Sequence, residues 1–402
     1  MARFPATPPG AGMRVRPFEG APPGYLYVQN GVYSGQTVRS REGSVLYVDS
    51  AAGAGNERGR LLVPYRDPRG FPMLFVGRDV DGSLAINAYC GTHLVGAMSL
   101  ATSGIGFPVW TVLGNQIVIS RRGDPLRVLG LDDGCDPYFE DIVAQERDLS
   151  PFDVTFDDNG PYLRTVPSAV VCHAWQERLW FSDGDDFLRC TNGLGDFEAL
   201  PVAAVRDVTW RGSNGVRAIS SLGDALVAFH YRGVTVGYGD PANGGGNFTT
   251  RQPPGALGYG CVAPRSVVEV GGALWFVSQN AQVCRFNGAA VEEMTRSVRE
   301  ELQPQAPISM DPEAARRWEA SMLPDAVAVY YDPWRSYVVM FEGEVAGVWD
   351  QGISVNVDTG QVSVQTGFDA QALCVKAGDE DTMLSLDRYG AVYAQDRGSR
   401  TR

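Results

Sequence analysis

One stretch of the sequence decides the fold: GALWFVSQNAQVCRF, residues Gly272–Phe286. It consists of an apolar run, a short polar segment and a second apolar run, which is the pattern of a β-hairpin. The first run, Leu274–Phe276, carries large apolar side chains at consecutive positions, so both faces of that strand must be covered. We therefore expect this hairpin to lie between two neighbouring sheets.

The same hairpin recurs along the chain at a nearly regular interval. When one apolar residue of each first strand is taken as an anchor, successive anchors lie 42, 62, 47, 48, 64 and 46 residues apart. Four short strands and three turns need roughly 40–50 residues, which is the size of one β-propeller blade. The seven hairpins, each with its anchor, are Leu74–Asn87 (Phe75), Asn115–Leu129 (Ile117), Glu177–Thr191 (Leu179), Asp224–Tyr238 (Leu226), Gly272–Phe286 (Leu274), Arg335–Trp349 (Val338) and Asp381–Gln395 (Leu384).

A hairpin of this size cannot fold alone. Burying its large apolar side chains stabilises it by about 6–12 kcal/mol in gross terms. Ordering the ~45 residues of one unit costs on the order of 1–2 kcal/mol per residue in backbone entropy. Neighbouring units must therefore cover both faces of each hairpin, as in other repeat folds. The sequence predicts an all-β, propeller-like fold of about seven blades, and the weak identity between units leaves six or eight blades compatible with it.

One segment precedes the repeat and two interrupt it. The Pro- and Gly-rich residues 1–23 are expected to form an N-terminal arm ahead of a propeller body, residues 24–402. The two long intervals hold predicted insertions at 136–167 and 291–324, where we expect contacts with neighbouring subunits because insertions lie outside the packed repeat. Short helices are predicted within them at YFEDIVAQE (Tyr138–Glu146), VEEMTRSVREEL (Val291–Leu302) and DPEAARRWEASM (Asp311–Met322).

Composition excludes several classes of protein. The chain has 402 residues, of which 44% are hydrophobic, so it can bury a substantial core. Its formal charge of −13 argues against tight nucleic-acid binding, which depends on neutralising phosphates. There is no apolar run long enough for a membrane span, and the N-terminal residues lack the apolar core of a secretory signal. Seven cysteines without a CxxC motif indicate reduced, mostly buried thiols.

No motif in the sequence predicts a catalytic centre or a bound cofactor. The three histidines do not have a metal-binding spacing, and nucleophile-elbow, Walker and dinucleotide-binding motifs are missing. We therefore expect a protein that is not an enzyme. Oxygen-rich turns can hold Ca²⁺, and Asp183, Asp185 and Asp186 are the weak candidates for a metal ion, with a solvated hairpin turn as the preferred interpretation.

Three segments, in order along the chain, resemble one protein family. The first is HAWQERLWFS (His173–Ser182), followed by LGDFE (Leu194–Glu198), the second runs from Val216 to Leu302, and the third spans Tyr330–Asp350. The second contains GCVAPRSVV and then LWFVS, which fit the family patterns G-x-x-x-P-x-S-V-V and L-x-F-V-S. The segments are similar to parts of the tail nozzle and packaged-DNA stabilisation β-propeller proteins of short-tailed bacteriophages.

The resemblance implies a structural role in the virion tail. Such proteins form a homohexameric ring below the portal and adaptor proteins, extend and gate the DNA-ejection channel, and carry tail fibres or spikes outside. Genomic DNA would pass through without sequence-specific binding, and the protein would be made in the cytoplasm of the bacterial host. Contacts with neighbouring subunits or partners are expected at Arg178, Arg189, Arg316, Arg317 and Trp318. A structural ion pair at a blade edge is the alternative for Arg178 and Arg189.

Other functions stay open at this point. The chain could be another part of the same virion, such as a tail-fibre adaptor or a receptor-binding propeller. It could also be a scaffold that binds a protein partner. An enzyme that acts on polysaccharide would need two carboxylates facing each other across a pocket, and sequence alone does not establish such geometry.

Overall fold

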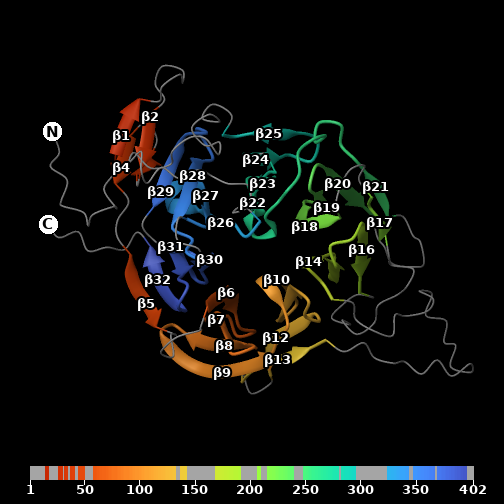
Figure 1. The fold of residues 1–402 in the computed structure, drawn as a ribbon, viewed down its shortest axis with the longest axis vertical. Helices are drawn as coiled ribbons and strands as arrows, with labels where there is room; N and C mark the ends of the chain where they lie inside the picture. The colour runs from red at the N-terminus through yellow and green to blue at the C-terminus, as the bar shows by residue number, and fades with distance from the viewer. Residues whose placement is uncertain are drawn as a thin grey trace, which may run out of the picture.

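Seven sheets, each with four antiparallel strands at its centre and one extended to six strands, surround a central axis in the computed structural model (Figure 1). Each sheet is one blade, so the described part of the chain is all-β and the predicted seven-bladed propeller is confirmed. The described residues include two short 3-10 helices, η2 (Pro264–Ser266) and η5 (Asp332–Trp334), and no helix long and apolar enough to cross a membrane. The structure describes residues 14–17, 26–29, 31–34, 37–40, 44–49, 58–132, 136–142, 168–191, 206–209, 215–239, 248–279, 282–295, 324–343, 347–366 and 369–395.

Blades 1 to 5 are each built from four strands that follow one another along the chain, with the first strand nearest the axis (Figure 1). Blade 1 consists of β6 (Arg58–Arg66), β7 (Pro72–Val80), β8 (Ser83–Cys90) and β9 (His93–Ala101). Blade 2 consists of β10 (Ile105–Leu113), β11 (Gln116–Arg122), β12 (Arg127–Leu131) and β13 (Pro137–Asp141). Blade 3 consists of β14 (Val171–Trp175), β15 (Arg178–Ser182), β16 (Phe187–Cys190) and β17 (Arg206–Asp207). Blade 4 consists of β18 (Val216–Leu222), β19 (Ala225–His230), β20 (Val234–Tyr238) and β21 (Thr249–Arg251). Blade 5 consists of β22 (Val268–Val270), β23 (Ala273–Val277), β24 (Val283–Phe286) and β25 (Val291–Glu293).

Blades 6 and 7 draw strands from both ends of the chain. Blade 6 consists of β26 (Val327–Tyr331), β27 (Ser336–Phe341), β28 (Gln351–Asn356) and β29 (Val362–Thr366). It is extended by β2 (Leu26–Gln29), which runs parallel to β29, and then by β1 (Arg14–Pro17), which lies within the predicted arm. Blade 7 consists of β30 (Ala372–Lys376), β31 (Asp379–Leu386), β32 (Ala391–Gln395) and, as its outer strand, β5 (Val45–Asp49). A separate hairpin is formed by β3 (Gly31–Ser34) and β4 (Thr37–Ser40).

The ring closes inside blade 7. There β5 pairs antiparallel with β32, and Val48 lies opposite Val392. Val48 is 5% exposed and belongs to a buried cluster that also contains Leu74 of blade 1 and Leu384 of blade 7. A strand from the beginning of the chain thus completes the last blade and covers the junction with the first.

Seven hydrophobic clusters of described residues hold the blades together, one for each pair of neighbours. Trp275 of blade 5 stacks on Tyr337 of blade 6 with ring centroids 5.7 Å apart. Phe229 of blade 4 meets Phe276 of blade 5 at 4.8 Å. The seven predicted anchor residues are all buried, and five of the six described cysteines are buried free thiols. Both faces of the second strands are therefore covered, as their apolar runs predicted.

The predicted helices in the two insertions are wrong where the structure describes them. Pro137–Asp141 forms β13, the outer strand of blade 2, instead of the beginning of a helix. Val291–Glu293 likewise forms β25, the outer strand of blade 5. A helix of two or three turns is only marginally stable by itself. These residues therefore gain more by pairing with the exposed edge of the neighbouring strand. The predicted helix over 311–322 lies outside the described residues.

The predicted hairpin Arg335–Trp349 is also wrong in its second strand, which was expected to end at Trp349. The strand that follows β27 begins at Gln351, and the residues just before it, 347–350, form a loop. Val348 and Trp349 are apolar, which produced the strand prediction. In the structure Trp349 is 5% exposed and reaches the central axis instead, as described below.

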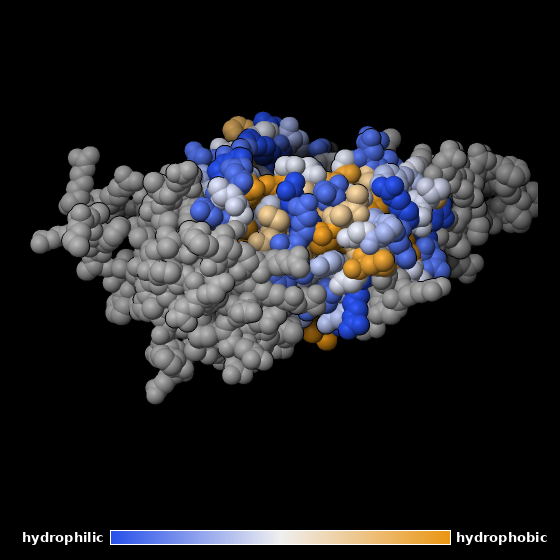
Figure 2. All heavy atoms as spheres, turned by 90° about the horizontal axis from the view of Figure 1, so that it is seen from above, coloured by the Kyte–Doolittle hydropathy of each residue, from blue (hydrophilic) through white to orange (hydrophobic). Residues whose placement is uncertain are grey.

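The outer surface mixes hydrophilic and hydrophobic residues, as the edge-on view shows (Figure 2). Large hydrophobic side chains are exposed on the outermost strands of blades 7 and 1, which are neighbours in the ring. Leu46 of β5 is 52% exposed, and Leu94 and Val95 of β9 are 56% and 46% exposed. These two strands form the rim of the ring, away from the clusters between blades.

One histidine is fully buried and another is half-buried between two blades, and both are held neutral. His230 has no exposed surface, and its Nε2 lies 3.1 Å from Thr235 Oγ1. His173 Nε2 lies 3.0 Å from Ser221 Oγ, between the first strands of blades 3 and 4. Burial lowers the pKa of each histidine to about 4, because the imidazolium form loses its hydration.

We expect these two histidines to make the protein less stable in acid. An unfolded histidine takes up a proton near pH 6.5 and the folded one only near pH 4, so the free energy of unfolding falls as pH drops through that window. At pH 4.5 the loss should be roughly 2–3 kcal/mol per histidine. Urea unfolding at pH 7 and 4.5 measures it, comparing the wild type with His173→Gln/His230→Gln. The double variant should lose much less stability on acidification, whereas His93→Gln, on an exposed side chain, should behave like wild type. An unchanged pH dependence in the double variant would contradict the assignment.

Candidate functional site: the two ends of the central channel

The first strands of the seven blades surround the central axis (Figure 1), and two cavities lie between them, so we call this axial space the central channel. We call the end at which these strands finish the turn end, because turns lead from there to the second strands. We call the opposite end, at which the first strands begin, the start end. The two ends carry different side chains and differ in whether the channel is open.

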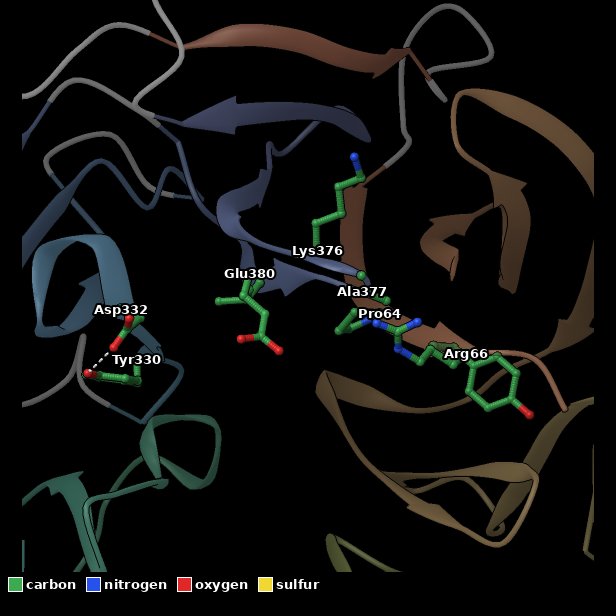
Figure 3. Close-up of a pocket in the computed structure, with 10 residues that line it drawn as sticks. Pro64, Arg66, Tyr330, Asp332, Lys376, Ala377 and Glu380 are labelled. Atoms are coloured by element: carbon green, nitrogen blue, oxygen red, sulfur yellow. Dashed lines mark hydrogen bonds between the residues drawn. The ribbon is translucent and has the colours of Figure 1, made fainter. Parts of the chain in front are cut away.

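A cavity of about 500 Å³ opens at the turn end, between blades 6, 7 and 1 (Figure 3). Its volume lies within the roughly 300–1,000 Å³ typical of small-molecule sites. Tyr330, Asp332 and Glu380 lie on one side of its open centre, and Arg66 lies on the other. Lys376 points away from the centre and binds Asp379 Oδ2 at 3.4 Å, outside the cavity. Charges of opposite sign therefore face each other across the cavity.

Hydrogen bonds fix the charges on the blade 6 side of this cavity. Tyr330 donates to Asp332 Oδ1 at 2.8 Å, and Arg335 donates to the same oxygen at 3.1 Å. These bonds lower the pKa of Asp332, while burial and the neighbouring Asp332 raise the pKa of Tyr330 to about 12. At neutral pH Asp332 is thus a carboxylate and Tyr330 a neutral phenol. A general base or acid needs a pKa near the working pH, so this wall suits binding better than proton transfer.

Carboxylates gather around the turn end of the channel. Five consecutive blades, 3 to 7, each carry an exposed acidic residue at or next to the turn between the first and second strands. Arg66, Arg335 and Lys376 lie at the same end and offset part of this charge, and the remaining carboxylates of this acidic rim repel a phosphate backbone. The five residues are Glu177, Asp224, Glu269, Asp332 and Glu380.

Phe107 closes the start end of the channel. Its ring, on β10 of blade 2, packs edge-on against Trp349 of blade 6 with centroids 4.9 Å apart. The guanidinium of Arg265, just before blade 5, lies 3.9 Å from the same ring, and that of Arg60 of blade 1 lies 4.6 Å from it. Blade 2 stands opposite blades 5 and 6 in a ring of seven, so these contacts form across the channel. We call Phe107, Trp349, Arg265 and Arg60 the plug.

A bulge in β10 positions the plug. The register between β10 and β11 shifts between Ile105 and Val109, which marks the bulge. Gly106 within it has a φ of 79°, a conformation that glycine adopts without strain. The carbonyl oxygen of Gly106 accepts a hydrogen bond of 3.0 Å from Arg121 Nε, and Arg121 in turn binds both oxygens of Asp79 at 2.8 Å. Phe107 is therefore held over the axis by backbone and side-chain bonds alike.

The plug leaves no passage for DNA through a single propeller. A double helix has a major groove that is itself about 12 Å wide, and it needs an open lumen. Here aromatic and guanidinium groups from opposite sides of the ring meet on the axis. Any duplex near this protein must run outside the blades.

The predicted metal ligands lie beside an arginine. Arg189 binds Asp185 at 2.7 Å and lies 3.8 Å from Asp183, at the hairpin turn of blade 3. Asp186 is partly buried, and burial together with Asp207 raises its pKa. Among the residues that the structure describes, no group of three or more acidic, histidine or cysteine side chains is placed to hold a metal ion. The contacts of Arg189 match the structural ion pair that was its alternative interpretation.

The other predicted contact residues lie apart from the channel. Arg178, at the start of β15, donates a hydrogen bond of 2.9 Å to the carbonyl oxygen of Thr191. It therefore ties neighbouring strands of blade 3 together. Arg316, Arg317 and Trp318 lie outside the described residues, so their predicted contacts stay a prediction.

Phe107, Arg60 and Arg265 are absent from the predicted site residues. They come from three different blades or their connections, and no spacing between them repeats along the chain. One local signal exists. The segment Gly104–Pro108, GIGFP, interrupts an apolar strand pattern with two glycines and a proline, as a bulge does. That signal predicts the bulge but not the residues that meet there.

Comparisons with known proteins find no family for this chain. No family model matches the sequence, and no curated protein matches it. BamB from Moraxella catarrhalis is 12% identical, with a TM-score of 0.43 over 85% of this chain and 84% of that chain. BBS1N, solved in complex with ARL6DN, is 12% identical, with a TM-score of 0.46 over 90% and 99%. The RRP9 WD40 repeats are 9% identical, with a TM-score of 0.49 over 88% and 99%. Similarity this low says nothing about what the chain binds.

Proposed function

We propose that this chain is a structural protein of a bacteriophage tail, which assembles into a ring that extends and gates the DNA-ejection channel. The support from the sequence is the resemblance of three ordered segments to nozzle and DNA-stabilisation propellers. Where described, these segments form β14 and β15, then β18 to β25, then β26 and β27. They therefore make up much of four adjacent blades, 3 to 6, rather than scattered pieces of the ring.

The plugged channel decides what form the proposal must take. Because Phe107 blocks the axis of the propeller, a DNA-conducting role requires a larger lumen shared between several copies. We propose six copies below the portal and adaptor proteins, with fibres or spikes outside. A chain of charge −13 with an acidic rim would let DNA slide past without adhering to it.

The exposed hydrophobic side chains on blades 7 and 1 support assembly. Leu46, Leu94 and Val95 lie on the rim of the ring of blades, where a neighbouring subunit could cover them. Contiguous exposed apolar groups on a folded protein commonly mark interaction surfaces. In this proposal the protein has no catalytic activity and no cofactor.

Quantitative mass spectrometry of purified virions tests the proposal. We expect six copies per particle, counted against the major capsid protein of the same sample. A reconstruction of the tail should place them in one ring on the axis below the portal. Absence of the protein from particles would refute the virion role altogether. Presence away from the axis, on a fibre or at the tip, would favour a fibre adaptor or receptor-binding propeller instead, for which the open cavity at the turn end provides a binding site.

A further inference from the structure

Two guanidinium groups, those of Arg60 and Arg121, share the carboxylate of Asp79 at the start end of the channel, and a third, that of Arg265, lies close by. Asp79 binds Arg121 through both oxygens at 2.8 Å and Arg60 Nε at 2.7 Å. Arg265 donates instead to two backbone carbonyl oxygens, and no carboxylate of a described residue lies within ion-pair distance of it. These three arginines and Asp79 together therefore carry more positive than negative charge.

This excess charge is largely shielded from water. The side chains of Arg60 and Arg121 are 15% and 3% exposed. Burial lowers the pKa of Arg265, the carboxylate of Asp325 partly opposes this, and the nearby Arg60 lowers the pKa further. Like charges repel strongly where water is scarce, so an anion between them would stabilise both.

A cavity of about 250 Å³ adjoins the two arginines of the plug. Arg60 and Arg265 line it, together with apolar side chains such as Leu62, Trp110 and Val327. Arg60 forms a hydrogen bond through Nε alone, so its two terminal nitrogens are donors without a partner in the described part of the chain. The volume is below the range of drug-sized ligands and suits a group of a few heavy atoms.

We propose that this cavity binds a small oxyanion, held between the guanidinium groups of Arg60 and Arg265. Guanidinium groups present their N–H donors in a planar fork that matches phosphate and carboxylate oxygens. Apolar walls around the site strengthen the attraction between the charges. The inference rests on the plug alone and holds whether or not the protein belongs to a virion.

Calorimetric titration with inorganic phosphate tests the proposal, at constant ionic strength maintained with chloride. We expect saturable binding of about one phosphate per chain and a melting midpoint that rises with phosphate concentration. Arg265→Gln should weaken binding by about tenfold or more, since one charge-assisted contact is worth about that factor. Acetate in place of phosphate shows whether the planar carboxylate is accepted too, and adenosine monophosphate, which exceeds the cavity, should not compete.

Matched variants separate binding from folding. Arg251→Gln removes an exposed arginine on the outer strand of blade 4, far from both cavities, and should bind phosphate like wild type. If Arg265→Gln does not unfold cooperatively, Arg265→Lys replaces it as the test. This variant keeps the positive charge and loses the planar guanidinium donors, so it should bind phosphate several-fold more weakly than wild type. Absence of saturable binding to wild type would overturn the proposal. So would phosphate binding of equal strength in wild type and in folded Arg265 variants, or an equal rise in melting midpoint with chloride alone.

Discussion

Deleting residues 1–49 is expected to abolish cooperative folding, whereas deleting residues 1–43 should leave a folded propeller. The shorter deletion keeps β5, and the longer one removes it from blade 7. Without β5, the edge of β32 loses its partner, and the cluster around Val48 between blades 7 and 1 loses one wall. A ring of blades depends on every junction, because each blade is stable only between its neighbours.

Thermal unfolding followed by circular dichroism, with size-exclusion chromatography, distinguishes the two truncated proteins. The protein without residues 1–43 should melt cooperatively, and the one without residues 1–49 should show no transition or aggregate. Deleting residues 1–23 only should weaken assembly between copies and leave the melting midpoint nearly unchanged. If the protein without β5 melted like the full chain, closure through blade 7 would not be what stabilises the ring.

Replacing Trp275 by alanine should destabilise the protein by about 3–5 kcal/mol, the usual cost of removing a buried aromatic ring. Trp275 is 2% exposed and stacks on Tyr337 at the junction of blades 5 and 6. The hydroxyl of Tyr337 donates to the carbonyl oxygen of Ser266 at 2.7 Å, so the partner ring is fixed and cannot collapse into the space. The cavity should therefore persist.

Urea unfolding of Trp275→Ala beside Leu257→Ala measures this difference. Leu257 is 62% exposed, so its truncation should change the free energy of unfolding by less than about 0.5 kcal/mol. Trp275→Phe, which keeps an aromatic ring, should fall between the two. A loss below about 1 kcal/mol for Trp275→Ala would mean that the junction between blades 5 and 6 tolerates a cavity.

The blades could be predicted because each hairpin is a local pattern. Leu274 and Val338, for example, lie in apolar runs too continuous for a half-exposed strand, and the structure buries both completely. The outer strands were harder to predict. Pro137–Asp141 has no such run, and its strand conformation comes from pairing with β12.

The plug could not be predicted because its parts are remote in sequence. Phe107, Arg265 and Trp349 meet only once the ring has closed around them, and no periodicity links their positions. Trp349 fits an apolar strand pattern equally well, which is why a strand was expected there. The acidic residues of the rim are easy to find in the sequence, but their common side of the channel follows only from the seven-bladed geometry.

The pairing of β5 with β32 also sets the order in which the protein can fold during its synthesis. Strand β5 is synthesised before blade 1, and its partner β32 is synthesised only after blades 1 to 6. Until then the edges of β5 and blade 1 have no cover, so the nascent chain carries unpaired strand edges while blades 2 to 6 are made. Contacts of such long sequence separation form slowly and favour aggregation. Production of this protein should therefore depend on chaperones or slow synthesis more than its many local hairpins alone would suggest.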